Sequence, residues 1–206
     1  MKLIINENGV LERVSFEDEP SPSIPNGVRN IGEGEFCDPV PLLELEIPRG
    51  VTGIGDGAFA RCDRLAKVTI PDTVSFIGNK AFYDCWSLTD VVFPDSVTRI
   101  GDEAFAECNQ LANVTLPAGL EHIGERAFAW CESLTGAIMF NSETHIGSEA
   151  FYGAIAQYLL TKSPGRGDRR RRAGLPDPGA GYTLQEAVYR RCNVSTLTRR
   201  WGRFRR

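Results

Sequence analysis

Residues 54–71 read I-G-D-G-A-F-A-R-C-D-R-L-A-K-V-T-I-P, and residues 77–94 read I-G-N-K-A-F-Y-D-C-W-S-L-T-D-V-V-F-P. Both stretches contain the framework I-G-x-x-A-F-x-x-C-x-x-L, at a spacing of 23 residues. The Ile-Gly pair of this framework returns every 23 residues, from residues 31–32 to residues 146–147, without an insertion. Because a fixed period of about 20 to 50 residues is the signature of repeat architectures, the sequence predicts a stacked solenoid.

One repeat contains the elements of a leucine-rich coil. Leu65, Val68 and Ile70 follow the L-x-x-L-x-L spacing of a leucine-rich repeat strand. Alternation along such a strand points Val68 and Ile70 inward, and Lys67 and Thr69 outward. The proline that follows ends the strand, because it cannot donate to the ladder. We interpret the Ile-Gly glycine as a turn residue, and Ala-Phe-x-x-Cys as a short helical turn on the convex side. The expected fold class is therefore α/β: a solenoid with a parallel β-ladder.

The composite pattern I-G-x-x-A-F-x-x-C-x-x-L-x-x-V-x-I-P resembles the BspA-type, or Treponema pallidum-type, leucine-rich repeat over about residues 24–154. The resemblance implies a curved parallel-strand solenoid, and such proteins are often surface proteins that bind host or partner proteins. The asparagine ladder of commoner leucine-rich repeats is absent, with Thr73, Ser96 and Gly119 near that place. We expect the repeated phenylalanines to form an interior spine of Phe59, Phe82, Phe105 and Phe128.

Composition divides the chain into four parts. Residues 1–23 contain two strand-like runs joined by an Asn-Gly turn and predict an N-terminal cap resembling a β-hairpin. Residues 24–161 hold the leucine-rich solenoid. Residues 162–181 are rich in Gly, Pro and Arg, which is typical of a linker. Residues 182–206 form a basic tail in which a capping-box pattern marks a candidate helix.

The net charge of −4 hides an asymmetry between the two ends of the chain. Residues 1–161 carry 10 Lys and Arg against 24 Asp and Glu, a net charge of −14. Residues 162–206 carry 13 against 3, a net charge of +10. The strongest anion-binding candidates are four adjacent cations, Arg169, Arg170, Arg171 and Arg172. They suit phosphate groups of nucleic acid, an anionic membrane or the acidic body of the chain. One alternative function is therefore a scaffold for a basic tail that binds nucleic acid or an anionic membrane.

The outward strand positions form the concave face that solenoids use for binding. The partner-binding candidates on this face are Glu44, Glu46, Lys67, Thr69, Asp90, Val92, Asn113, Thr115 and Ile138. One of their two columns is small and partly apolar, and the carboxylates favour a basic partner. The plainer interpretation is that they are ordinary strand formers at exposed positions. We predict a non-enzymatic protein-protein interaction module, adhesin-like, that binds a protein or peptide.

The sequence favours neither a metal site nor a catalytic site. Four of the six cysteines occupy one column of the repeat, at Cys62, Cys85, Cys108 and Cys131. Zinc sites require short C-x-x-C pairs, so these cysteines are interpreted as small buried hydrophobic residues. His122 and His145 lie one repeat apart without a third ligand in their column. No phosphate-binding loop or catalytic triad pattern occurs. We expect no enzymatic activity, no cofactor and no small-molecule substrate.

Hydropathy bears on location. No apolar run approaches the roughly 18 residues that span a bilayer. The first apolar run, Leu3 to Ile5, is too short for the core of a secretory signal. The chain as written is expected to be cytoplasmic, and it is expected at the cell surface if it is a fragment of a longer protein.

Overall fold

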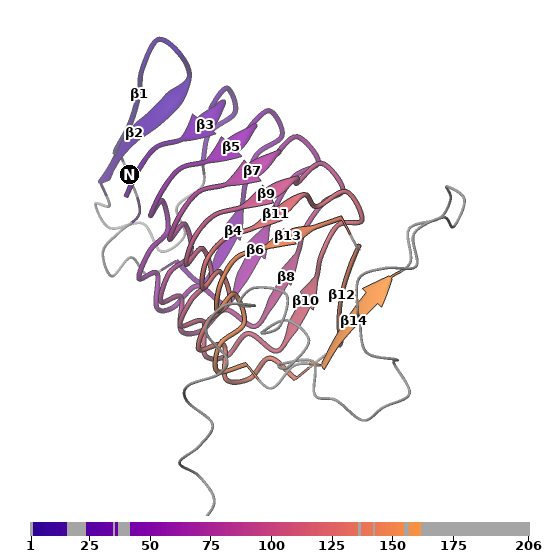
Figure 1. The fold of residues 1–206 in the computed structure, drawn as a ribbon. Coiled ribbons are helices and arrows are strands. Elements are labelled where there is room, and N and C mark those ends of the chain that lie inside the picture. Colours follow the sequence, from indigo (N-terminus) through magenta and orange to yellow (C-terminus); the bar gives the residue numbers. More distant parts are fainter. Residues whose placement is uncertain are drawn as a thin grey trace, which may run out of the picture.

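The computed structural model describes residues 2–15, 24–34, 36, 42–135, 137–141, 143–154 and 157–161. These residues contain fourteen β-strands and no helix. Successive coils lie side by side in one stack, with β1 (Lys2–Ile5) and β2 (Val10–Ser15) at one end. At the other end lie β12 (Ala137–Asn141) and β14 (Gln157–Thr161) (Figure 1). The chain is therefore a parallel-strand β-solenoid, which confirms the predicted repeat architecture.

One side of the stack is an eight-stranded sheet in the order β1-β2-β3-β5-β7-β9-β11-β13. Its two-residue strands are β3 (Asn30–Ile31), β5 (Gly53–Ile54), β7 (Phe76–Ile77), β9 (Arg99–Ile100), β11 (His122–Ile123) and β13 (His145–Ile146). Each ends on the buried isoleucine of the Ile-Gly pair, which pairs in parallel with its counterpart, as Ile77 does with Ile100. The sequence interpretation assigns only a turn to this part of the repeat and misses this sheet.

A four-stranded parallel sheet forms on the expected strand segments, in the order β10-β8-β6-β4. Its strands are β4 (Glu44–Glu46), β6 (Lys67–Thr69), β8 (Asp90–Val92) and β10 (Asn113–Thr115). In β6 the side chains of Lys67 and Thr69 are exposed and that of Val68 is buried. Ile70, which follows the strand, is also buried. The predicted inward and outward directions in this repeat are confirmed.

The turn face, which comprises the segments after each Ile-Gly pair such as residues 79–88, consists of tight turns. The Tyr83 N–H donates to the Lys80 carbonyl, three residues earlier, at 3.0 Å. Phe82 and Asp84 instead donate their N–H groups to the next coil, at 2.8 and 2.9 Å. In an α-helix these N–H groups would donate to the carbonyl four residues earlier in the same segment. The left-handed φ of 55° at Lys80 and 56° at Asp84 also interrupts a helix. The expected helical turns are not confirmed, and the described residues form an all-β solenoid rather than an α/β repeat.

Phenylalanine rings stack along the solenoid axis at the centre of the core. From Phe36 to Phe151 the centroids of neighbouring rings lie 4.8 to 5.3 Å apart and the rings lie within 26° of parallel. Phe105 is completely buried and also meets Phe93 edge-on, with centroids 5.4 Å apart. Stacked, dispersion-rich contacts of this kind continue across every coil boundary. The predicted interior spine is therefore confirmed.

The Ile-Gly glycines allow neighbouring coils to approach each other. A Cβ on Gly101 would stand 2.6 Å from the backbone nitrogen of Asn79 and from the carbonyl carbon of Gly78. The φ of Gly101 is not in the left-handed region. A turn does begin at the equivalent glycine, where the Ala81 N–H donates to the Gly78 carbonyl at 3.4 Å. The requirement for glycine, however, is space for the backbone of the preceding coil.

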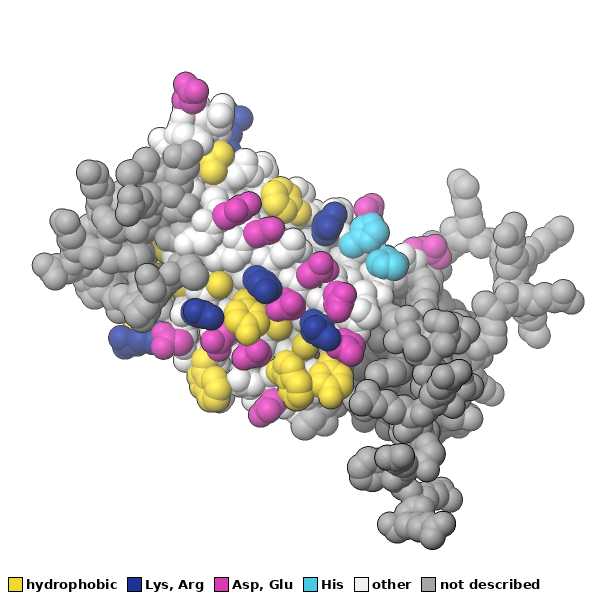
Figure 2. Space-filling view, turned by 60° about the vertical axis from the view of Figure 1, so that its left-hand side comes forward, with side chains coloured by type: hydrophobic (Ala, Val, Ile, Leu, Met, Phe, Trp, Pro, Cys, Tyr) yellow, Lys and Arg dark blue, Asp and Glu magenta, His cyan; other side chains and the backbone are white. Residues whose placement is uncertain are grey.

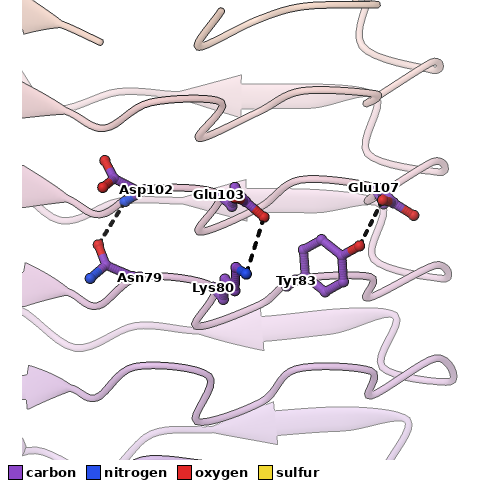
Figure 3. A network of polar contacts seen from close by, with 6 residues as sticks. All are labelled: Asn79, Lys80, Tyr83, Asp102, Glu103 and Glu107. Atoms are coloured by element: carbon purple, nitrogen blue, oxygen red, sulfur yellow. Dashed lines mark hydrogen bonds and ion pairs between the residues drawn. The ribbon is translucent and has the colours of Figure 1, made fainter. Parts of the chain in front are cut away.

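A ladder of short polar side chains follows these glycines. The side-chain oxygen of Asp56 accepts the backbone N–H of Asn79 at 2.7 Å, and that of Asn79 accepts the N–H of Asp102 at 2.8 Å (Figure 3). Asp102 in turn accepts the N–H of Glu125 at 2.8 Å. These bonds satisfy backbone donors that face the preceding coil. The chain therefore does contain a polar ladder, at a different position of the repeat from the one considered in the sequence.

A hairpin extends the eight-stranded sheet at its amino-terminal end. Strands β1 and β2 pair antiparallel, and the Gly9 N–H donates to the Asn6 carbonyl at 2.9 Å in the turn between them. Strand β2 pairs in parallel with β3, and Leu11 is completely buried. A capping role for residues 1–23 stays a prediction, since residues 16–23 lie outside the described part. No helix that is long and apolar enough to cross a membrane occurs among the described residues.

Candidate functional site

The outward side chains of the four-stranded sheet form two aligned columns, here called the sheet face. In one column Glu44 is in register with Lys67, and Asp90 is in register with both Lys67 and Asn113. All four side chains are exposed. The Asn113 amide donates to Asp90 Oδ1 at 2.9 Å, which holds the carboxylate over the sheet. The structure thus brings the charged candidates into one row with alternating signs.

The second column of the sheet face is small and partly apolar. Glu46 is in register with Thr69, and Val92 is in register with Thr115. Val92 is 67% exposed, the largest value among the exposed large hydrophobic residues of the described part. Protein interfaces in general combine an apolar centre with a polar rim.

Ile138 does not belong to this face. It lies exactly one period, 23 residues, beyond the exposed Thr115 but is completely buried. Leu134 and Ile146 keep the 23-residue spacing on either side and are also buried. Burial of the apolar Ile138 side chain is favourable, whereas the polar Thr115 at the equivalent position stays exposed. The prediction of Ile138 as a partner-contact residue is therefore wrong.

A groove of about 470 Å³ opens on the turn face of the last four complete coils, a site that the sequence interpretation missed. It is lined by Tyr83, Glu103, Ala106, Glu107, Arg126, Ala129, Trp130, Glu149 and Tyr152. Ala106 and Ala129 are buried and occupy the same position of the repeat as Tyr83 and Tyr152. Two small side chains between two large ones in one column leave the hollow. This Tyr-Ala-Ala-Tyr order is visible in the sequence once the 23-residue period is used to align it.

The walls of the groove are two columns of residues with left-handed backbone. Glu103, Arg126 and Glu149 have φ values of 52°, 51° and 55°, and Glu107 and Trp130 have values of 62° and 61°. Arg126 Nε donates to Glu149 Oε2 at 2.6 Å. Figure 2 shows this face, where carboxylates and hydrophobic side chains lie close to one another.

Charge at one end of the groove is concentrated on Glu107. The Tyr83 hydroxyl donates to Glu107 Oε1 at 2.7 Å, while Lys80 Nζ lies 3.5 Å from Glu103 Oε2 (Figure 3). The hydrogen bond to Glu107 is the main cause that raises the pKa of Tyr83 to about 12. Burial, and then the charge of Glu107, raise the pKa of Asp84. The charge of Glu107 is a secondary cause of both shifts, after a hydrogen bond in Tyr83 and burial in Asp84.

The cysteine column is structural. Cys62, Cys85, Cys108 and Cys131 are buried free thiols. Each thiol donates to the carbonyl oxygen 26 residues earlier, as Cys108 does to Phe82 at 3.2 Å. Burial raises the pKa of the Cys108 thiol well above its usual value, which disfavours the reactive thiolate. The interpretation as small buried hydrophobic residues is confirmed.

The two histidines lie on the last two strands of the eight-stranded sheet, β11 and β13, where they are neighbours (cyan in Figure 2). His122 and His145 are in register, with ring centroids 5.6 Å apart. Within the described ranges, no group of three or more His, Cys, Asp or Glu side chains is placed to hold a metal ion. The cationic candidates Arg169, Arg170, Arg171 and Arg172 lie outside the described residues.

Known proteins resemble this repeat region. Residues 21–156 match the family model described as BspA type leucine rich repeat region, in 6 copies. A leucine rich cell surface protein of Faecalibacterium prausnitzii is 31% identical, with a TM-score of 0.65 over 77% of this chain and 48% of its own. A leucine-rich repeat protein from Bacteroides ovatus is 25% identical, with a TM-score of 0.53 over 78% and 51%. The pneumococcal vaccine antigen PcpA shares the fold, with 20% identity and a TM-score of 0.65 over 77% and 41%.

These matches cover only part of the related structures. The chain spans about half the length of the Faecalibacterium prausnitzii protein. No curated protein matches it. The family model nevertheless covers well over half of the chain, with the Ile-Gly, Ala-Phe and Cys columns that build the coil. The chain therefore belongs to the BspA-type leucine-rich repeat family.

Proposed function

We propose that this protein is a non-enzymatic interaction module whose sheet face binds an extended segment of a partner protein. The observation that carries the proposal is the register of β4, β6, β8 and β10, which repeats two outward side chains on every coil. A segment lying along the stack meets an equivalent position at each step of about 4.8 Å. Repeat proteins use such extended surfaces for binding.

The chemistry of the sheet face favours a basic partner segment with an apolar residue. The sheet face carries more negative than positive charge, with the carboxylates of Glu44, Glu46 and Asp90 against the single cation Lys67. Val92 offers an exposed apolar contact between them. Burial of such a side chain at the centre of a contact contributes more than the charges at its rim, which mainly steer association.

The proposal includes a location at a cell surface. Its support is the 31% identical Faecalibacterium prausnitzii protein, which is described as a cell surface protein. Antibody labelling of intact cells, with permeabilised cells as the control, tests this part. Labelling only after permeabilisation would contradict it.

A peptide-display selection against the full chain tests the binding site. The selected peptides are expected to carry Lys or Arg together with an apolar residue, and Val92→Asp is expected to weaken their binding at least tenfold. Trp86→Ala is the matched control, since Trp86 is exposed by 52% and lies on the turn face. Equal binding by the parent and the Val92→Asp variant would exclude the sheet face as the contact surface.

A further inference from the structure

The groove on the turn face is separate from the sheet face and has a composition suited to cations. Its carboxylates are Glu103, Glu107 and Glu149, and its aromatic side chains are Tyr83, Trp130 and Tyr152. Trp130 and Tyr152 meet edge-on, with ring centroids 4.8 Å apart, and remain 46% and 42% exposed. Exposed aromatic faces beside carboxylates attract a planar guanidinium, which stacks on rings and donates to carboxylates.

The carboxylates of the groove are only partly neutralised by the described residues. Arg126 pairs with Glu149, and Lys80 approaches Glu103. Among the described residues Glu107 has no ion pair with a cation, and its hydrogen bond comes from the neutral Tyr83 hydroxyl. The groove therefore keeps a net negative charge, and Arg126 shows that a guanidinium fits its wall.

The same chain carries a segment of complementary charge. Residues 162–206 have a net charge of +10 against −14 for residues 1–161, and four of the cations are consecutive, at 169–172. The surrounding stretch from 163 to 181 is rich in glycine and proline, which suits a tether. Opposite charges on one chain interact at an effective concentration set by the tether rather than by the protein concentration.

The tether is long enough to reach the groove. Tyr152 lines the groove, and Thr161 ends β14. Thr161 lies nine positions after Tyr152, so it is at most about 32 Å away along an extended chain. The eleven residues from Thr161 to Arg172 span up to about 39 Å, which exceeds that distance. The length of the tether therefore allows Arg172 to reach the Tyr152 end of the groove.

We propose that the arginine run at residues 169–172 docks in the groove of the turn face of its own chain, with guanidinium groups against Glu107 and the Trp130 ring. The docked segment covers the exposed aromatic side chains and offsets the excess negative charge. The acidic turn face is then closed to other basic ligands, while the sheet face stays open.

Tryptophan quenching in the full chain provides the first test. The chain has three tryptophans, and Trp86→Phe with Trp201→Phe leaves Trp130 as the only reporter. Acrylamide quenching of Trp130 is expected to rise when arginines 169–172 are all replaced by serine. It is also expected to rise in the parent as salt increases from about 0.01 M to about 1 M, because the Debye length falls from about 30 to about 3 Å.

A matched reporter controls for general effects of salt and substitution. A variant that retains Trp86 and carries Trp130→Phe and Trp201→Phe should show no response to the arginine replacements, because Trp86 does not line the groove. Unchanged quenching of Trp130 on arginine replacement would overturn the proposal, as would an equal response of Trp86.

Chemical cross-linking in a mixture of unlabelled and isotope-labelled protein identifies the docking position. It also shows whether the arginine run and the groove belong to the same chain. Arg170→Lys places one amine in the run, and a carbodiimide then joins it to nearby carboxylates. Links to Glu103, Glu107 or Glu149 within one chain are expected, with the Lys80 to Glu103 link as an internal control, since those groups lie 3.5 Å apart. Links between light and heavy copies would assign the docking to a second chain. Links mainly to Glu44, Glu46 or Asp90 would place the run on the sheet face. Either result would overturn the proposal.

Discussion

The rings of Phe105 and Phe128 lie nearly parallel, with centroids 5.3 Å apart and an interplanar angle of 5°. Both side chains are completely buried. Each ring thus contributes to two coil boundaries, so the aromatic stack joins the repeats into one cooperative unit instead of stabilising each coil alone.

Replacement of Phe105 by alanine is expected to lower the free energy of unfolding by about 3 to 5 kcal/mol, because it opens a cavity at two boundaries of the stack. Chemical denaturation monitored by circular dichroism measures the loss. Tyr152→Ala removes an aromatic side chain that is 42% exposed and should cost much less. Equal losses in the two variants would contradict the stacked interior.

The replacement Gly101→Ala is expected to destabilise the protein by about 1 to 3 kcal/mol, because its Cβ would lie 2.6 Å from the backbone of the preceding coil. Gly119→Ala is the matched control, since the nearest atom to its Cβ, the Asp95 carbonyl oxygen, is 3.6 Å away. The control should be neutral or slightly stabilising, because alanine restricts the unfolded chain. Thermal unfolding of both variants checks the comparison, and a neutral Gly101→Ala would exclude close backbone approach as the reason for the glycine.

The burial of Ile138 and the exposure of Val92, at equivalent positions of the repeat, predict opposite outcomes for two threonine substitutions. Ile138→Thr buries a hydroxyl and loses apolar contact, so it is expected to cost roughly 2 kcal/mol or more. Val92→Thr keeps a branched side chain on an exposed strand and should change stability by less than about 0.5 kcal/mol. Denaturation midpoints of the two variants would be similar only if Ile138 faced solvent.

Tyr83 predicts a loss of stability at high pH. Its pKa is raised from 10.0 to about 12, chiefly by the hydrogen bond to Glu107, so the folded chain holds the phenol proton more tightly than the unfolded chain. The resulting stabilisation is present below pH 10 and is lost as pH rises from about 10 to about 12. Glu107→Gln removes the carboxylate charge and is expected to lower the pKa of Tyr83 toward 10.

Ultraviolet titration of the tyrosinate band measures this change. The Tyr83→Phe variant identifies the contribution of Tyr83 among the five tyrosines. If the parent and the Glu107→Gln variant gave the same pKa for Tyr83, the hydrogen bond between Tyr83 and Glu107 would not be the cause of the raised pKa.

Much of the architecture follows from local sequence. The 23-residue period and the L-x-x-L-x-L spacing locate β6 and its equivalents, and the alternation of Lys67, Val68 and Thr69 specifies their buried side. The repeated phenylalanine predicts the ring stack, since only an apolar column at one position of each coil can bury itself between neighbours. The cysteine column is placed in the interior for the same reason.

Features that depend on contacts between coils do not follow from one repeat. The eight-stranded sheet, and the absence of helix from the part of the chain that the structure describes, depend on N–H groups that bond to the neighbouring coil, as Phe82 does to Ala104. The role of Gly101 depends on the backbone of the coil before it. The sequence of a single repeat does not show which groups of the neighbouring coils it will contact. Local propensity therefore favours a helical turn, whereas in the stack the same N–H groups form hydrogen bonds between coils.

The sequence by itself determined the coil, its period and the identity of its interior side chains. The reason is that apolar residues return at the same positions every 23 residues and can be buried only by stacking. Tertiary structure alone decided where the alternation of the repeat breaks, as at Ile138, and where the surface is hollow. Ile138 is buried, although the equivalent residue Val92 is exposed, because removal of a large apolar side chain from water is favourable. The groove arose because Ala106 and Ala129 lie between Tyr83 and Tyr152 only when the coils are stacked.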